Sequence, residues 1–167
     1  MKSYHVGVSA EAFAAAMFAR CECDVSVQYG ANQPEYDLMI SSLDKIVKVS
    51  VKGSQDGSWG LTQNFKNPEN NYHDAIDLWL AKHSVKTIFC LVQFINCDLN
   101  TLPRIYLATP LEISSLMKMG AKGRGDTILY ENKTWTKRSP AYGTIDKIPD
   151  PWIFSKSRLD YIMNTYG

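Results

Sequence analysis

The sequence lacks the features that would assign it to several specialised classes of protein. Its 167 residues carry a net charge of only +1, so the chain as a whole has no electrostatic bias towards nucleic acid or an anionic membrane. A local basic patch remains compatible with this sum, because binding depends on where the charges lie. No apolar run approaches the roughly 20 residues that span a bilayer, and the N-terminus has no secretion-signal layout. We therefore expect a cytoplasmic protein with no membrane partner.

Cysteine and histidine are scarce and poorly spaced for metal binding. The four cysteines, Cys21, Cys23, Cys90 and Cys97, are too few for a disulfide-dense secreted scaffold. Only one residue separates Cys21 from Cys23, whereas structural zinc sites usually leave about two to four residues between paired ligands. We therefore expect reduced thiols and no zinc site. The spacing of His73 and His83 does not match a metal-binding pair on one helical face.

The sequence does contain the composition and periodicity of a globular α/β protein. Apolar residues make up 45% and charged residues 21%, and the length suits a single domain over residues 1–167. The patterns predict helices at 4–21, 72–84, 110–119 and 152–166, strands at 24–29, 36–41, 46–52, 87–95, 104–108 and 127–131, and loops at 30–34 and 42–44. Residues 53–71 are polar and rich in glycine, which favours a loop or a ragged hairpin. This order predicts a mixed β-sheet flanked by helices.

Two carboxylates and one lysine are candidates for a shared site. Asp37 begins one predicted strand and Lys52 ends the next, so a hairpin would bring the two side chains together. Ser50 and Lys52 point to the same face of their strand, because side chains alternate along a strand. Glu11, on an alanine-rich helix, is the third candidate. A carboxylate can hold Mg²⁺ against a phosphate, and a neighbouring ammonium can stabilise the negative charge that develops during phosphodiester hydrolysis.

Each of these three residues also has an ordinary structural interpretation. Asp37 would suit a turn at the start of a strand, and Lys52 would suit a solvated strand edge. Glu11 would suit the exposed surface of a helix. Their combined order along the chain is what favours a functional interpretation.

The same residues resemble the motif of a known nuclease superfamily. Gly7-x-x-x-Glu11, Tyr36-Asp37-Leu38-Met39-Ile40 and Val49-Ser50-Val51-Lys52 are similar to the PD-(D/E)XK pattern, and by pattern to group I intron-associated endonucleases and Holliday junction resolvases. The resemblance implies a restriction-endonuclease-like α/β fold and a homodimeric, Mg²⁺- or Mn²⁺-dependent endonuclease acting on duplex or branched DNA. It assigns catalytic roles to Glu11, Asp37, Ser50 and Lys52, with Asp37 as the principal metal ligand and Glu11 as a further one.

Ser50 departs from the pattern, since the family usually has Glu, Asp or Gln at this position. A serine hydroxyl is a weak, neutral ligand, so the site would attract a divalent cation less strongly. Some members of the superfamily recruit a carboxylate from a following helix. Here Asp74 is the preferred candidate for that metal ligand, with Glu69 and Asp77 as alternatives, although Asp74 could instead interact with the N-terminus of its own helix. The alternative function is a catalytically inactive nuclease-fold module that binds DNA or a protein in a mobile-element, defence or immunity system.

A second candidate region is basic and rich in glycine. Lys118, Lys122 and Arg124 lie among glycines that would allow a close approach to phosphate, although a solvated loop is an equally good interpretation. Trp135 could stack on unpaired bases, as could Tyr142, but packing is the commoner role of such rings. Gln55, just beyond Lys52, is a candidate contact to DNA or a turn residue.

Overall fold

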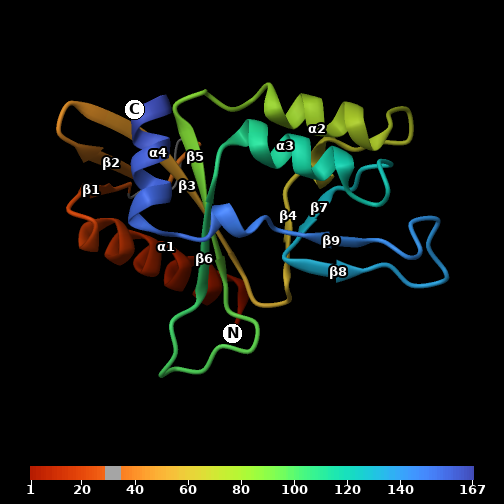
Figure 1. The fold of residues 1–167 in the computed structure, drawn as a ribbon, viewed down its shortest axis with the longest axis horizontal. Helices are drawn as coiled ribbons and strands as arrows, with labels where there is room; N and C mark the ends of the chain where they lie inside the picture. Colours follow the sequence, from red (N-terminus) through yellow and green to blue (C-terminus); the bar gives the residue numbers. More distant parts are fainter. Residues whose placement is uncertain (29–34) are drawn as a thin grey trace. The chain divides into compact units, whose positions relative to one another are not determined.

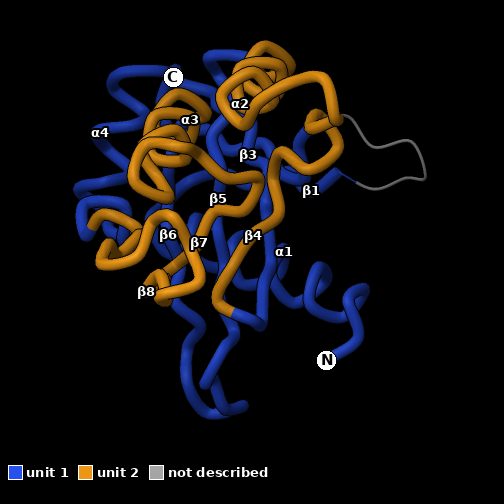
Figure 2. The backbone as a smooth tube through the Cα atoms, turned by 90° about the vertical axis from the view of Figure 1, so that its right-hand side faces the viewer, with its two compact units in different colours: residues 1–56, 84–109, 150–167 blue, residues 57–83, 110–149 orange. Residues whose placement is uncertain are grey.

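The computed structural model describes residues 1–28 and 35–167, which divide into two compact units. Unit 1 comprises residues 1–56, 84–109 and 150–167, and unit 2 comprises residues 57–83 and 110–149 (Figure 2). The chain therefore leaves unit 1 twice and returns to it twice. Each unit has its own sheet structure and its own pair of α-helices.

Unit 1 is built on a five-stranded mixed sheet with the order β1-β2-β3-β5-β6 (Figure 1). The strands are β1 (Asp24–Val27), β2 (Leu38–Ser42), β3 (Lys45–Ser54), β5 (Thr87–Gln93) and β6 (Arg104–Ala108). β2 runs antiparallel to both β1 and β3, β3 and β5 are parallel, and β6 is antiparallel to β5. Parallel neighbours need a crossover connection, and here the connection consists of residues of unit 2.

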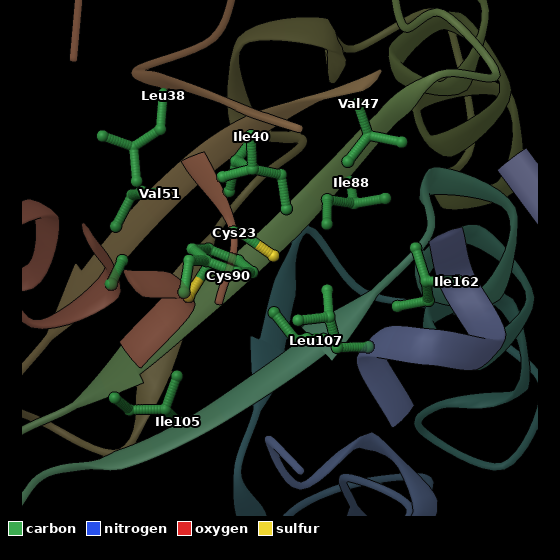
Figure 3. Close-up of a cluster of buried hydrophobic side chains, with 14 of the residues drawn as sticks. Cys23, Leu38, Ile40, Val47, Val51, Ile88, Cys90, Ile105, Leu107 and Ile162 are labelled. Atoms are coloured by element: carbon green, nitrogen blue, oxygen red, sulfur yellow. The ribbon is translucent and has the colours of Figure 1, made fainter. Parts of the chain in front are cut away.

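Two helices of unit 1, α1 (Ser3–Arg20) and α4 (Lys156–Tyr166), contribute to one hydrophobic core with the sheet. A short 3₁₀ turn, η2 (Asp150–Trp152), precedes α4. The core contains buried side chains from both helices and from alternate positions of the strands (Figure 3). β3 shows the alternation clearly, since Val47, Val49 and Val51 are buried in this core whereas Lys48 is exposed.

α1 approaches β3 closely at Gly53, and the approach depends on the absence of a side chain there. A Cβ atom on Gly53 would lie 2.8 Å from the Cβ of Ala10 and 2.9 Å from the carbonyl oxygen of Val6. Neither atom is the end of a flexible side chain, so neither can move aside. The contact sets Glu11, the neighbour of Ala10, close to the end of β3 that carries Lys52.

Unit 2 contains two helices and two small sheets. Helices α2 (Tyr72–Leu80) and α3 (Pro110–Met119) contact each other. A short 3₁₀ turn, η1 (Gln63–Phe65), precedes α2. The strands form two antiparallel pairs: β4 (Ser58–Gly60) with β7 (Ile128–Tyr130), and β8 (Asn132–Thr134) with β9 (Ile145–Lys147).

The α/β class and the mixed sheet are confirmed, but some predicted elements were wrong. Residues 53–71 are not a loop: they include the end of β3, then β4, which pairs with the distant β7, and η1. The predicted helix 72–84 ends at Leu80. The predicted helix 152–166 begins only at Lys156, because Ser155 caps it by accepting the N–H of Arg158 at 3.1 Å. The predicted loop 30–34 and the end of the predicted strand 24–29 lie outside the described residues.

Among the described residues, no helix has both the length and the apolar character needed to cross a membrane.

Gly53→Ala should lower the free energy of unfolding by about 1–3 kcal/mol, because the added methyl group has no room against α1. Gly7→Ala is the matched control, since nothing lies within 4 Å of a Cβ atom at that helical position. Alanine is the better helix former by up to about 1 kcal/mol, so this variant should be more stable than the parent. Urea denaturation measures both effects, and a change of the same sign and size in the two variants would contradict the close approach.

Candidate active site in unit 1

Asp37 is fixed where β2 begins beside β3. The pairing of the two strands starts with Leu38 opposite Val49. One residue earlier, Asp37 donates its N–H to the carbonyl of Val49 at 2.9 Å, and its Oδ2 accepts the N–H of Val51 at 2.6 Å. A side-chain oxygen thus serves as the acceptor for β3 at this point, and it holds the carboxylate beside the segment that joins Ser50 to Lys52.

Glu11 interacts electrostatically with both Asp37 and Lys52. Burial raises the pKa of the Glu11 carboxyl above its usual value, the charge of Asp37 raises it further, and the charge of Lys52 lowers it. Such influence requires proximity, because exposed charges more than about 10 Å apart are largely screened in solution. The structure therefore brings the three side chains into one electrostatic neighbourhood, from α1, the start of β2 and β3.

Ser50 and Lys52 lie on the same face of β3, but their surroundings differ. Ser50 is only 2% exposed, whereas Lys52 is partly exposed. A buried hydroxyl can contribute a neutral oxygen to a site but no charge. The acidic position of the motif is thus occupied by a group that offers a cation little electrostatic attraction.

Sequence reasoning missed a polar network at the end of β3. The fully buried Gln93 donates from Nε2 to Ser54 Oγ at 3.1 Å, and Ser54 donates to Asp56 Oδ1 at 3.0 Å. Gln93 Oε1 in turn accepts the N–H of Ile95 at 3.0 Å. The sequence signal was Gln93, the single amide near the end of an apolar run. A buried amide must find hydrogen-bond partners, so its position indicated a polar network. The network joins β3 to β5 two residues beyond Lys52.

The oxygen atoms of this site suit a hard cation. Mg²⁺ is usually bound by one or two carboxylates together with substrate phosphate oxygens. Glu11 and Asp37 supply two carboxylates, and Ser50 supplies a hydroxyl. In the part of the chain that the structure describes, no group of three or more His, Cys, Asp or Glu side chains could hold a metal.

Asp74, the predicted further metal ligand, lies in unit 2 and caps α2. Its Oδ2 accepts the N–H of Asn71 at 3.1 Å, and Asn71 Oδ1 accepts the N–H of Asp74 at 2.9 Å. This reciprocal pair is a capping box, so Asp74 has the local structural role considered for it. Of the two alternatives, Asp77 accepts a hydrogen bond from Lys118, and Glu69 is exposed. A metal-binding role for any of them stays a prediction.

The predicted DNA-binding residues lie in both units. In unit 1, Gln55 forms two hydrogen bonds with Met1, both 2.8 Å long: the N-terminal ammonium donates to Oε1, and Nε2 donates to the carbonyl. In unit 2, Lys118 pairs with an acid on α2, whereas Lys122 and Arg124 are exposed in the turn after α3. Their contact with DNA stays a prediction.

All four cysteines are free. Burial raises the pKa of Cys90, and burial is also the main cause of the raised pKa of Cys23. These shifts disfavour the thiolate form that reacts and binds metals.

Comparison of the chain with protein-family models, with curated proteins and with solved structures found no match. A functional assignment therefore rests on the side chains themselves and on their chemistry.

Glu11→Gln tests the electrostatics of the site. A carboxyl whose pKa is higher in the folded than in the unfolded state stabilises the fold below its ordinary value of 4.5, and that stabilisation is lost as the pH rises through the folded-state pKa. Without metal at neutral pH, the substitution should therefore raise the free energy of unfolding, by less than about 1 kcal/mol because the side chain is partly exposed. The gain should vanish in acid.

Denaturation curves measured from acid to neutral pH give the free energy of unfolding of Glu11→Gln and of the parent. Glu69→Gln, at an exposed position of unit 2, is the control. A Glu11→Gln variant that loses stability at neutral pH would show that Lys52, and not burial and Asp37, dominates at Glu11.

Proposed function

We propose that the chain is a metal-dependent endonuclease that hydrolyses phosphodiester bonds of DNA on a restriction-endonuclease-like fold of the PD-(D/E)XK superfamily. The proposal is supported by the close packing of Ala10 against Gly53 and by the hydrogen bond from the Val51 N–H to Asp37, which favour the approach of Glu11, Asp37 and Lys52. A first helix, the start of one strand and the body of the next each contribute one group, in the order of the motif. The parallel strand β5, added beside β3 after a crossover, is compatible with the same fold.

The proposed roles follow from the charge of each group. Mg²⁺ or Mn²⁺, when bound, would supply positive charge against the scissile phosphate. Asp37 would be its principal ligand, and Glu11 would bind it or orient the attacking water. Lys52 would stabilise the negative charge that develops on the phosphate oxygens. Addition of water to phosphorus and cleavage of the bond to the leaving sugar oxygen give a phosphate monoester and a hydroxyl group.

The substrate implies a symmetric assembly. Cutting both strands of duplex or branched DNA needs two active sites, so we propose a homodimer as the working form. Exposed polar and basic side chains would contact the DNA backbone, with Gln55, Lys118, Lys122 and Arg124 as the proposed contacts.

Asp37→Asn and Lys52→Met should each lower metal-dependent cleavage of plasmid DNA by about 10²–10³-fold, a usual loss when a group that stabilises the transition state is removed. Asparagine can still accept the N–H of Val51, so the fold should survive. Asp44→Asn, in the turn after β2, and Lys48→Met, on the exposed part of β3, are matched controls that should cleave normally. Conversion of supercoiled plasmid to nicked and linear forms in Mg²⁺ or Mn²⁺ measures the rates. Full activity in both site variants would refute the proposed roles.

A catalytically inactive module on the same fold is the second candidate. It is favoured by the burial of an uncharged residue, Ser50, at the position where the motif has an acid. Such a module would bind DNA or a protein and leave plasmid DNA intact.

Ser50→Asp tests whether position 50 faces a bound cation. Ligand charge sets the affinity of oxygen sites for divalent cations, so an added carboxylate beside Asp37 should tighten Mn²⁺ binding at least several-fold. Without metal, the variant should lose about 2 kcal/mol or more of unfolding free energy, because it buries a charge. Ser50→Asn has a similar size without the charge and is the control. Calorimetric titration with Mn²⁺ measures affinity, and equal affinity in parent and Ser50→Asp would show that position 50 does not face a cation.

A further inference from the structure

Unit 2 contains a cluster of cations and aromatic rings that the proposed catalytic roles do not use. It comprises six partly or fully exposed side chains, here named the cation–aromatic cluster: Lys66, Tyr72, Arg124, Tyr130, Lys133 and Trp135. They come from the segment before α2, the start of α2, the turn after α3, and strands β7 and β8 with the residue that follows β8.

The rings and the cations alternate in space. Arg124 Cζ lies 5.0 Å from the centre of the Tyr72 ring and 5.8 Å from the centre of the Trp135 ring. Lys133 Nζ lies 5.6 Å from the Trp135 ring centre and 5.2 Å from that of Tyr130. Tyr130 and Trp135 meet edge to face, with ring centres 5.9 Å apart. Lys66 Nζ lies 5.6 Å from the Tyr72 ring centre, so each cation is within cation–π range of an aromatic face.

The turn after α3 holds Arg124 against α2. Gly125 has a φ of +81°, and a Cβ atom there would lie 3.1 Å from Tyr72 Cβ and 3.2 Å from His73 Cδ2. His73 Nε2 also donates to the carbonyl of Gly123 at 3.0 Å. Glycine allows both the left-handed backbone and the close approach, so the position of Arg124 over the Tyr72 ring is built into the local fold.

Trp135 is anchored by its edge. Its Nε1 donates to Asp146 Oδ2 at 2.8 Å, and the same oxygen accepts the N–H of Ala121 at 2.9 Å. The polar edge of the indole is therefore satisfied within unit 2. Arg124 and Lys133 lie over the partly exposed ring, so a base that stacks on it would displace one of these side chains towards the phosphate. The other tryptophans, Trp59, Trp79 and Trp152, are at most 5% exposed.

The charges of the cluster call for an anionic ligand. Arg124 and Lys133 lie 5.8 Å and 5.6 Å from the same ring centre, so both contribute to one positive potential around Trp135. Asp126 Oδ2, 3.7 Å from an Arg124 nitrogen, offsets part of it. The stretch from Lys118 to Arg138 nevertheless carries six Lys or Arg residues against two Asp or Glu residues.

A strand of nucleic acid matches both properties, since it offers a phosphate and a flat base at every nucleotide. Bases in a duplex are stacked on one another, so only unpaired nucleotides can present a free face to an aromatic ring.

We propose that the cation–aromatic cluster binds unpaired nucleotides of a DNA substrate, with bases stacked on Trp135 and Tyr72 and phosphates held by Lys66, Arg124 and Lys133. This inference rests on the proposed function for its choice of DNA, and it narrows the substrate to DNA with a single-stranded segment. Because every base has a π-face, the cluster confers no strong sequence preference.

Binding measured in EDTA separates this inference from catalysis. Fluorescence anisotropy compares one labelled oligodeoxynucleotide as a single strand and as a blunt duplex. The single strand should bind at least about tenfold more tightly, and Trp135→Ala and Tyr72→Ala should each weaken its binding about tenfold, as expected for the loss of one base-stacking contact. Duplex binding should change less than about twofold in the same variants. Tyr161→Ala, at an exposed aromatic position of α4 in unit 1, is the matched control and should bind as the parent does.

Two further measurements guard against a misfolded variant. Trp135 is the one tryptophan exposed enough to meet a ligand, so the single strand should quench part of the intrinsic fluorescence. Trp135→Phe keeps a ring and should retain most of the affinity while it loses that quenching. Lys133→Gln should reduce the slope of log affinity against log salt by about 0.7, as expected when one phosphate contact to a single strand is removed.

Equal affinity for single strand and duplex, or single-strand affinity that survives both Trp135→Ala and Tyr72→Ala, would overturn the inference. Neither result concerns cleavage, which the proposed function assigns to Asp37 and Lys52 in the presence of metal. Conversely, a protein that binds the single strand through these rings but cleaves neither plasmid nor a duplex with a single-stranded gap in Mg²⁺ or Mn²⁺ would uphold the cluster and refute the nuclease.

Discussion

The close contact between α1 and β3 is the constraint on which the proposed site depends. Gly53 and Ala10 allow the helix to lie against the strand, where any larger residue would force them apart. The contact sets the acid that follows Ala10 close to the end of β3, where Lys52 precedes Gly53. Asp37 joins them because its carboxylate replaces a main-chain acceptor at the start of β2. Packing of small residues thus determines where the charged groups meet.

This placement has an electrostatic cost. The pKa of Glu11 is raised because burial and Asp37 together outweigh the attraction of Lys52. A protein that only needed a stable helix would gain from a neutral residue at this position. A cation between the two carboxylates would reverse the balance, since it favours the charged form of both. The destabilised carboxylate is therefore easier to explain in a site that binds a cation than on an ordinary helix surface.

Local patterns were sufficient for much of the fold but not for the smallest strands. β6 and α3 occupy their predicted ranges: β6 is a short apolar run rich in strand-forming residues, and α3 has a proline at its start and a glycine just after its end. β4, β8 and β9 have three residues each, too few to show a period of two. β4 also pairs with a strand almost seventy residues away, so its partner supplies the order that its own sequence does not indicate. The helix that begins at Tyr72 ends at Leu80, earlier than expected. The residues after Leu80 are compatible with a helix, so the sequence did not indicate this end.

The candidate site was predictable to a different degree for each residue. The register of a hairpin brings Asp37 beside the end of β3, and a hairpin can be anticipated from sequence. The position of Glu11 depends on how a helix packs on a sheet, which only the tertiary structure determines. Asp74 was attractive as a ligand, yet the Asn71-x-x-Asp74 spacing is itself a capping pattern, and that local rule accounts for it. The cation–aromatic cluster joins residues near position 70 to residues near position 130, so the sequence alone indicated only Arg124 and Trp135.

The most direct test of a shared cation is a double-mutant cycle of Mn²⁺ affinity, measured by calorimetry on the parent, Glu11→Gln, Asp37→Asn and the double variant. If both carboxylates bind one ion, each single substitution should weaken binding at least about tenfold, and the double variant should lose much less than the sum of the two free-energy changes. Once one carboxylate is removed, Mn²⁺ is already bound weakly, so removal of the second carboxylate lowers the affinity little further. Additive losses, or an affinity that neither substitution changes, would show that Glu11 and Asp37 do not share an ion.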